Sequence, residues 1–411
     1  MKGIFRDFVP EKGDSKMKKN KNRQLFIDKQ ALATLSFAKE GILAPVDKLM
    51  NKKEAEEVDK TGFYKGIPFP FPFIIAPFGK KNANVLTSAI QGEELDFVVD
   101  GKIRGSIVVD EVFEINKKRR IEQIFGTYDT SNPETELFLK RLGDYAISGE
   151  YELDFDDIKD IKNTIAQAKE RIQPKNVASV MMSARPFHRA HERLIRITLE
   201  KTDLLVIFLL KPYTEDLISY KLRLKTLQYF VDNYLPKSRV IIVPFENTYI
   251  FAGYNNAVLD SICARNFGCD KLVLGQRHSG IGMYYDKNEM KSILNKYKSL
   301  DIDVDIITEF VYCNECKTLV SKNTCPHGQH HHIKYESETL MELLKVGILP
   351  PAVLMRKDIS AILLSEMFPD RFENIQKIYD NIFPTSGLLE SHDEKDFYLE
   401  LMNLHQTTSL T

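Results

Sequence analysis

The stretch VASVMMSARPFHRAHE occupies residues 177–192 and joins an apolar run to a polar segment that contains two histidines. Val177 to Met182 has the composition of a buried strand, and apolar residues recur at helical spacing from His188 to Glu200. The stretch therefore predicts a strand that leads into a helix. In an open α/β sheet, ligands bind outside the carboxyl ends of the strands, where helix N-termini present free amides. This junction is a candidate binding site.

The same alternation continues towards the C-terminus. Strand and helix signals follow one another at residues 204–210, 217–233, 240–243, 257–266 and 271–274. Strands that alternate with helices predict a parallel α/β sheet with helices on both faces. Beyond Pro350-Pro351, the remaining residues predict a small helical extension.

The first part of the chain, to about residue 165, has a different pattern of short strands and turns. Residues 67–76 contain several prolines and cannot be helical. Two strand signals flank Asp100-Gly101-Lys102, which is typical of a hairpin. We expect a compact, mainly β domain here, and a polar helix near residues 154–172 that links it to the α/β unit.

Length and composition limit the class of protein. A chain of 411 residues is expected to form two or three domains. The formal net charge of -1 argues against a general nucleic-acid binder, which needs an excess of Lys and Arg. The basic run from Lys16 to Arg23 is interpreted as a solvated N-terminal arm. No apolar run approaches the roughly 20 residues of a membrane helix, and no signal peptide is recognisable, so we expect a cytosolic protein.

His188 and His191 are three residues apart, which places both imidazoles on one side of a first helical turn. With Arg189 between them, they can bind a polyphosphate and stabilise charge on a transferring phosphoryl group. Histidine pairs at this spacing are more often ordinary surface or core residues, but the position at a strand–helix junction favours a site. The chain contains no G-x-x-x-x-G-K-[ST] motif, which excludes a P-loop route to ATP.

The segment 186–192, PFHRAHE, resembles the N-P-x-H-R-A-H-E block of ATP sulfurylases. Further segments resemble that family in the same order along the chain. They are 44–50 (S-P-L-x-G-F-M in the family), 124–129 (V-F-G-T-x-D), 252–257 (A-G-P-R-E-A), 275–282 (G-R-D-H-A-G-x-G) and Pro350-Pro351 with Arg356 (P-P-x-x-x-x-R).

The resemblance implies a domain plan and a reaction. It implies a PUA-like β-rich domain in residues 1–170, a Rossmann-like nucleotidyltransferase domain in 171–350 and a small helical region in 351–411. The implied reaction is attack of sulfate on the α-phosphorus of ATP, which Mg²⁺ accompanies, to give adenylyl sulfate and pyrophosphate, or the reverse. A homodimer or larger assembly is also implied.

The resemblance also implies roles for individual residues. His188 and His191, with Arg189, are expected to hold the phosphates and stabilise the transition state. The rest of the nucleotide site is expected to come from the second loop, at Gly275, His278, Gly280 and Gly282.

The chain departs from the family where sulfate should bind. The Gln, Arg and Asn of the family's Q-x-R-N motif are Met182, Ala184 and Arg185 here. In the second loop the Arg of G-R-D is Gln276, and the Arg of A-G-P-R-E-A is Asn255.

Arg185 and Arg277 each stand one residue downstream of a lost arginine and, with Ser279, are the candidates for binding the substrate anion. A one-residue shift along a strand, however, turns a side chain to the opposite face. A different oxyanion or acceptor, or a non-catalytic nucleotide-binding homologue, therefore remains an alternative.

Three of the five cysteines, Cys313, Cys316 and Cys325, are followed by a histidine-rich stretch. This spacing is typical of a closed tetrahedral zinc site that staples a loop, predicted within residues 311–333. The candidates for the fourth ligand are His327, His330, His331 and His332; we predict His330, with His327 second. Zinc-containing ATP sulfurylases carry a similar C-x-x-C, C-P-H arrangement.

Overall fold

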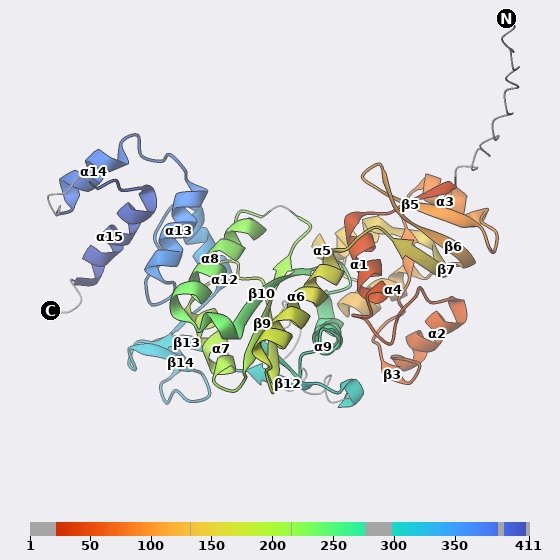
Figure 1. Ribbon diagram of the computed structural model, residues 1–411, viewed down its shortest axis with the longest axis horizontal. Coiled ribbons are helices and arrows are strands. Elements are labelled where there is room, and N and C mark those ends of the chain that lie inside the picture. Colours follow the sequence, from red (N-terminus) through yellow and green to blue (C-terminus); the bar gives the residue numbers. More distant parts are fainter. Residues whose placement is uncertain (1–21, 132, 215, 276–297, 385–389, 408–411) are drawn as a thin grey trace, which may run out of the picture.

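A five-stranded parallel sheet lies at the centre of the molecule (Figure 1). The computed structural model describes residues 22–131, 133–214, 216–275, 298–384 and 390–407. The strands of this sheet are β8 (Val177–Met182), β9 (Leu204–Lys211), β10 (Val240–Glu246), β11 (Lys271–Gly275) and β12 (Asp303–Ile307). Their order is β10-β9-β8-β11-β12. Strands β9 and β10 are added on one side of β8, and β11 and β12 on the other side. The position between β8 and β11 is therefore the topological switch point, where such sheets bind ligands.

Helices cover both faces of this sheet, as predicted. They are α6 (Asp157–Ile172), α7 (Arg189–Leu199), α8 (Tyr220–Tyr234) and α9 (Asn256–Asn266). Alternate residues of β9 enter two separate cores, because successive side chains of a strand point to opposite faces. Val206 packs in the core that contains Ile165 of α6, and Ile207 packs in the core that contains Ile195 of α7.

The N-terminal unit is built on a second five-stranded sheet. Its strands are β1 (Arg23–Phe26), β4 (Ile75–Pro77), β5 (Glu94–Val99), β6 (Lys102–Glu114) and β7 (Leu142–Leu153), in the order β1-β5-β6-β7-β4. Only the β1–β5 pair is parallel among these strands. Asp100 and Gly101 form the predicted hairpin turn, with positive φ angles of 48° and 75°. Between β1 and β4 in the sequence, β2 (Phe63–Tyr64) and β3 (Ile67–Pro68) form a separate two-stranded antiparallel ribbon.

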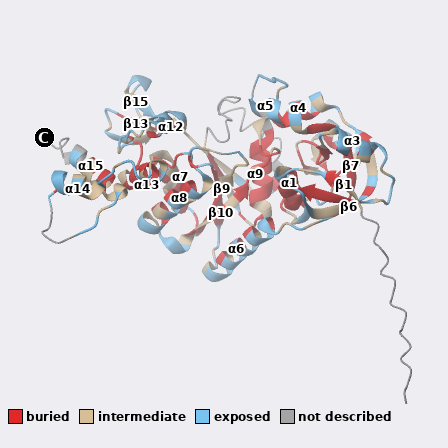
Figure 2. Cartoon of the chain, turned by 90° about the horizontal axis from the view of Figure 1, so that it is seen from above, coloured by how far each residue is buried: buried red, intermediate tan, exposed pale blue. Residues whose placement is uncertain are grey.

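The N-terminal unit is more helical than the sequence pattern indicated. It contains α1 (Lys29–Lys39), α2 (Lys52–Thr61), α3 (Lys80–Thr87), α4 (Lys117–Phe125) and α5 (Pro133–Arg141). Every residue of α1 from Ala31 to Ala38 is buried (Figure 2). A helix buried on all sides lacks the amphipathic period by which a helix is recognised in a sequence.

The two units share one apolar core. Phe37 of α1 packs against Phe245 and Phe251, with ring centroids 5.2 Å apart in both pairs. A 3-10 turn at Gly253–Asn255 meets α4 of the N-terminal unit, where the Asn255 side-chain amide donates to the Gln123 carbonyl at 2.8 Å. Two of the segments that resemble ATP sulfurylases, 124–129 and 252–257, therefore lie against each other.

The rest of the chain forms a small antiparallel sheet and a helical end. The sheet contains β13 (Phe310–Cys313), β14 (Thr318–Ser321) and β15 (His332–Lys334), in the order β14-β13-β15. The helices are α12 (Ser337–Lys345), α13 (Lys357–Met367), α14 (Ile375–Ile382) and α15 (Glu394–Thr407). Helix α13 packs against both α8 and α15. Among the helices that the structure describes, none is long and apolar enough to cross a membrane.

Candidate nucleotide site and metal centre

His188 is the N-cap residue of α7, with an extended backbone at φ -144° and ψ 176°. It follows β8 after the short connection 183–187, so it stands at the carboxyl edge of the sheet beside the switch point. The structure therefore has the strand–helix junction that the sequence predicted.

The two histidines of this junction are in direct contact. Their ring centroids are 3.9 Å apart, and the backbone N–H of His188 donates to Nδ1 of His191 at 3.3 Å. Because Nδ1 of His191 accepts, a neutral His191 ring carries its proton on Nε2. The His188 ring is also stacked on Tyr335 at 5.6 Å, and its Nε2 lies 3.4 Å from Ser337 Oγ.

Burial keeps both imidazoles neutral. It lowers the pKa of His191 from 6.5 to about 4. It lowers the pKa of His188 well below its ordinary value, and the neighbouring His191 adds to that shift. Near neutral pH the pair therefore offers N–H donors rather than positive charge. Positive charge for an anionic ligand has to come from elsewhere.

Arg189 is engaged in a polar network on another side of α7. Its Nε donates to the Ala352 carbonyl at 3.2 Å, and its Nη1 lies 3.3 Å from Glu192 Oε2. Glu192 is buried and also receives Arg356 Nε at 2.9 Å. Burial raises the pKa of Glu192, and the two arginines oppose that shift. In this arrangement Arg189 ties α7 to the segment after Pro350-Pro351, and its part in catalysis stays a prediction.

The residues at the end of β8 divide into buried apolar and exposed charged positions. Met182 and Ala184, which replace the family's Gln and Arg, are buried in an apolar core. Arg185 is exposed, and its Nε lies 2.6 Å from Asp216 Oδ2. The sequence analysis missed Arg223 of α8, which is buried and donates from Nη1 to the Ser183 carbonyl at 2.8 Å. The signal for it was an arginine at a core-facing helical position, next to Leu222 and Leu227.

Of the second predicted loop, Gly275 is among the described residues. Gly275 ends β11, which pairs with β8 in the sheet, so it reaches the same carboxyl edge as the histidine junction. The other predicted residues of that loop, Arg277, His278, Ser279, Gly280 and Gly282, lie outside the described residues.

The structure brings the three predicted cysteines together with one histidine. Nδ1 of His327 lies 3.2 Å from Cys316 Sγ, 3.5 Å from Cys313 Sγ and 3.7 Å from Cys325 Sγ. The sulfurs of Cys316 and Cys325 are 3.9 Å apart. A tetrahedral zinc ion with ordinary bond lengths needs about 3.6 Å between S and N and about 3.8 Å between two sulfurs. The four side chains therefore fit Zn²⁺.

The histidine that the structure groups with the three cysteines is His327 and not His330, the predicted fourth ligand. His330 is exposed and lies outside the group of ligand atoms. The reason is the short connection after Cys325: the 3-10 turn Gln329–His331 and strand β15 begin almost at once. His332 is held in β15 by its pairing with Cys313, and its Nε2 reaches only Cys325 Sγ, at 3.3 Å. His327 is the histidine whose ring nitrogen lies close to all three thiols.

Comparison with known proteins decides the family. Residues 157–366 match the family profile described as ATP-sulfurylase, and residues 3–153 match that of a PUA-like domain. The chain belongs to the ATP-sulfurylase family. Its N-terminal unit is a PUA-like domain, and the central sheet is the Rossmann-like nucleotide-binding domain of this family.

Members of the ATP-sulfurylase family are similar to this chain over most of its length. The sulfate adenylyltransferase of Chloroflexus aurantiacus is 24% identical over 348 residues, which are 82% of this chain and 90% of the relative. That of Psychrobacter sp. is 28% identical, over 79% of this chain and 80% of the relative. Among solved structures, a hexameric APS kinase from Thiobacillus denitrificans superposes with a TM-score of 0.62 at 16% identity. The superposition covers 83% of this chain and 62% of that chain. Because the identity is low, it supports the fold alone.

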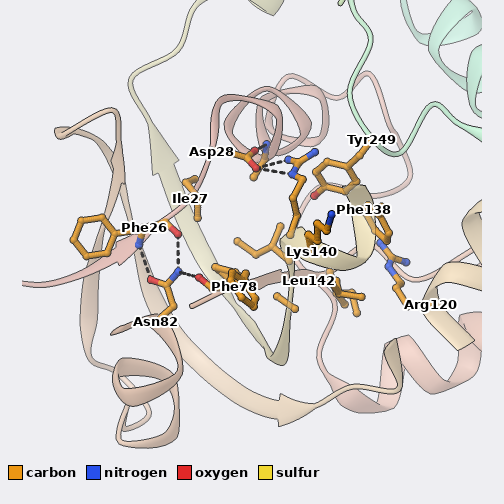
Figure 3. A pocket seen from close by; sticks show the side chains of 16 residues that line it. Phe26, Ile27, Asp28, Phe78, Asn82, Arg120, Phe138, Lys140, Leu142 and Tyr249 are labelled. Atoms are coloured by element: carbon orange, nitrogen blue, oxygen red, sulfur yellow. Dashed lines mark hydrogen bonds and ion pairs between the residues drawn. The ribbon is translucent and has the colours of Figure 1, made fainter. Parts of the chain in front are cut away.

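A separate cavity of about 320 Å³ lies mainly in the PUA-like domain, and Tyr249 contributes to its wall (Figure 3). Arg141 is one of its lining residues: Nε donates to Asp28 Oδ2 at 2.8 Å, and the guanidinium lies 4.8 Å from the centre of the Tyr249 ring. The cavity contains none of the residues predicted for the ATP-sulfurylase site.

Proposed function

We propose that this chain transfers AMP from ATP to sulfate, giving adenylyl sulfate and pyrophosphate, or catalyses the reverse reaction. The observation that carries the proposal is the pair of neutral histidines at the N-terminus of α7, beside the switch point of a family-typical sheet. The similar proteins from Chloroflexus aurantiacus and Psychrobacter sp. are named for this activity.

The chemistry requires few groups. A sulfate oxygen forms a bond to the α-phosphorus while the bond from that phosphorus to the bridging oxygen breaks, and pyrophosphate leaves with the electron pair. His188 and His191 donate N–H hydrogen bonds to phosphate oxygens whose charge grows in the transition state. The N-terminal amides of α7 add to that stabilisation. Mg²⁺, bound with ATP, would neutralise part of the phosphate charge.

The zinc group supports this site structurally. The four side chains would close the coordination sphere of a bound Zn²⁺ and would leave no position for a substrate. Strand β15 leads from the ligands to Tyr335, which packs on His188. We also propose a cytosolic homodimer, since clustered thiols fit a reducing compartment and the family resemblance supports the assembly. The domain limits 1–170, 171–350 and 351–411 stay a prediction. Helix α6 (Asp157–Ile172), which packs on the central sheet, lies across the first of these limits.

The second candidate function is adenylyl transfer to a different acceptor. It is favoured by Met182 and Ala184, which are buried and apolar where the family has Gln and Arg. A different acceptor would need fewer charged groups at the end of β8.

Molybdate-dependent release of pyrophosphate from ATP tests the proposal, because molybdate imitates sulfate and its adenylyl product hydrolyses. We expect release with sulfate, selenate or molybdate and none without an oxyanion. Absence of release with all three would reject sulfate adenylyl transfer. In that event, ATP binding measured by calorimetry indicates a changed acceptor, and absence of ATP binding indicates a non-catalytic homologue.

A further inference from the structure

Arg223 carries a positive charge that the described structure leaves without a full set of partners. Only 2% of the residue is exposed. Its Nη1 donates to the Ser183 carbonyl, but in the described parts of the chain neither Nε nor Nη2 has a hydrogen-bond partner. Burial lowers the pKa of Arg223, yet a guanidinium stays protonated in proteins. A buried charge with unmade hydrogen bonds is costly unless a ligand completes it.

The two free nitrogens form one side of the guanidinium. Nε–H and Nη2–H point in parallel and match two oxygens of a carboxylate, phosphate or sulfate. The bond from Nη1 to Ser183 holds the plane of the group at the carboxyl end of β8. Ser183 and Arg185 are exposed, so the strand end beside the buried Arg223 guanidinium lies at the surface.

Asp216 does not neutralise the local charge. Its carboxylate pairs with Arg185 through Oδ2, and Oδ1 has no partner among the described residues. One carboxylate thus faces two guanidiniums, because its charge also acts on Arg223. The group formed by Arg185, Asp216 and Arg223 therefore keeps one net positive charge.

We propose that Arg223 binds the acceptor oxyanion through Nε and Nη2, in place of the polar amide missing at Met182 and the guanidinium missing at Ala184. This inference rests on the proposed function and names the residue that selects a tetrahedral, doubly charged acceptor. The positive charge then comes from a side chain of the neighbouring helix α8 and not from a residue at the end of β8.

Kinetics with Arg223→Lys and Arg223→Gln test the proposal. We expect KM for sulfate to rise about 10- to 100-fold, more for Gln than for Lys, since hydrogen bonds to charged groups are lost. Binding of ATP alone, measured by calorimetry, should not change. Asp216→Asn should leave the sulfate KM unchanged or lower it, because both guanidiniums are then free.

Arg239→Lys is the matched control. The Arg239 guanidinium bonds to the backbone carbonyls of Leu199, Thr202 and Asp203, at the opposite end of the sheet. Its replacement should lower the thermal midpoint without changing the sulfate KM. An unchanged sulfate KM in both Arg223 variants would overturn the proposal. So would a loss of ATP affinity equal to the rise in the sulfate KM, because the anion would then be a phosphate of ATP.

Direct binding separates this inference from the proposed function. If the native protein fails to turn over any oxyanion, the sulfate-dependent rise of its thermal midpoint is compared with that of Arg223→Lys. A rise in the native protein that is lost in the variant supports Arg223 as an anion-binding residue despite the missing activity. No rise in the native protein, or an equal rise in both, contradicts it.

Discussion

At the scale of single residues, the hydrogen-bond donors and the positive charges of the site come from different side chains. His188 and His191 are neutral donors because desolvation lowers the pKa of both rings, and positive charge lies with Arg185 and Arg223 at the end of β8. A neutral imidazole can hold a phosphate oxygen without repelling Mg²⁺ or a nearby guanidinium. We therefore expect the histidines to affect turnover through their N–H groups, and stability to depend on pH through the lowered pKa of His191.

Replacement of His191 should affect turnover more than stability. His191 is half-buried, and its Nε2 is the donor that we assign to a phosphate oxygen. We expect His191→Ala to lower kcat by about 10²- to 10³-fold, the effect of losing one such donor. Arg193→Ala, an exposed position on the same helix, is the control for stability. A thermal midpoint far below that of the control, with kcat retained, would make His191 a core residue.

The shifted pKa of His191 predicts how stability depends on pH. Its folded pKa of about 4 lies below the ordinary 6.5, so between these values the unfolded chain binds more protons than the folded one. The contribution of the neutral His191 ring to the free energy of unfolding is therefore complete above pH 6.5 and is lost as the pH falls towards 4. In urea unfolding, the stability of the native protein should therefore fall relative to that of His191→Gln as the pH decreases over this range. Parallel curves would show that the pKa is not depressed.

Residue types in the chain were sufficient to predict the histidines but not Arg223. His188 and His191 occur in a motif next to a strand signal, so their position follows from local sequence. Arg223 is 40 residues from Ser183, and their contact depends on which face of α8 packs against β8. That face is decided by tertiary packing, which a single helical period does not specify.

At the scale of secondary-structure elements, the proposed zinc ligands lie in and beside a small sheet that has little core of its own. Val311 is fully buried, but most residues of β14 and β15 are at least partly exposed. A structural zinc ion supplies the stability that such a sheet lacks. Loss of the metal should therefore free β15, and with it Tyr335 behind His188.

Metal content distinguishes the two histidine candidates. We expect about one Zn²⁺ per chain in the native protein, as for any single four-ligand site. His327→Ala should lose most of the metal, whereas His330→Ala, at an exposed neighbouring position, should keep it. Elemental analysis after gel filtration measures both. Zinc retained in His327→Ala and lost in His330→Ala would restore the original prediction.

The elements of the central sheet were predictable from sequence, and those of the PUA-like domain were not. Strands β8 to β11 are largely buried, mostly apolar runs that alternate with helices, and a single sequence is enough to show this pattern. Helix α1 is buried throughout, so its apolar residues have no helical period to detect. In the zinc segment, spacing identified the three cysteines, but the choice among four histidines depended on where β15 begins.

At the scale of the whole molecule, the contact between segments 124–129 and 252–257 joins the PUA-like domain to the catalytic sheet. Gly253 has a positive φ of 61°, and a Cβ on it would lie 2.5 Å from Phe125 Cα and 2.8 Å from the Ile124 carbonyl oxygen. Both are backbone atoms, so neither can move aside as a flexible side chain would. Glycine is therefore required here by the interface as well as by the backbone angle.

Gly253→Ala should weaken the joint between the two units. Gly101→Ala is the matched control, because its φ of 75° carries the same backbone strain but no atom lies within 4 Å of its added Cβ. The control should cost about 1–2 kcal/mol for the left-handed angle alone. Gly253→Ala should cost about 1–3 kcal/mol more, as overpacked cores do. Calorimetry should also resolve its unfolding into separate transitions for the two units, because their shared core opens at this contact. Equal losses in the two variants, with a single transition in each, would show that the interface tolerates the added methyl group.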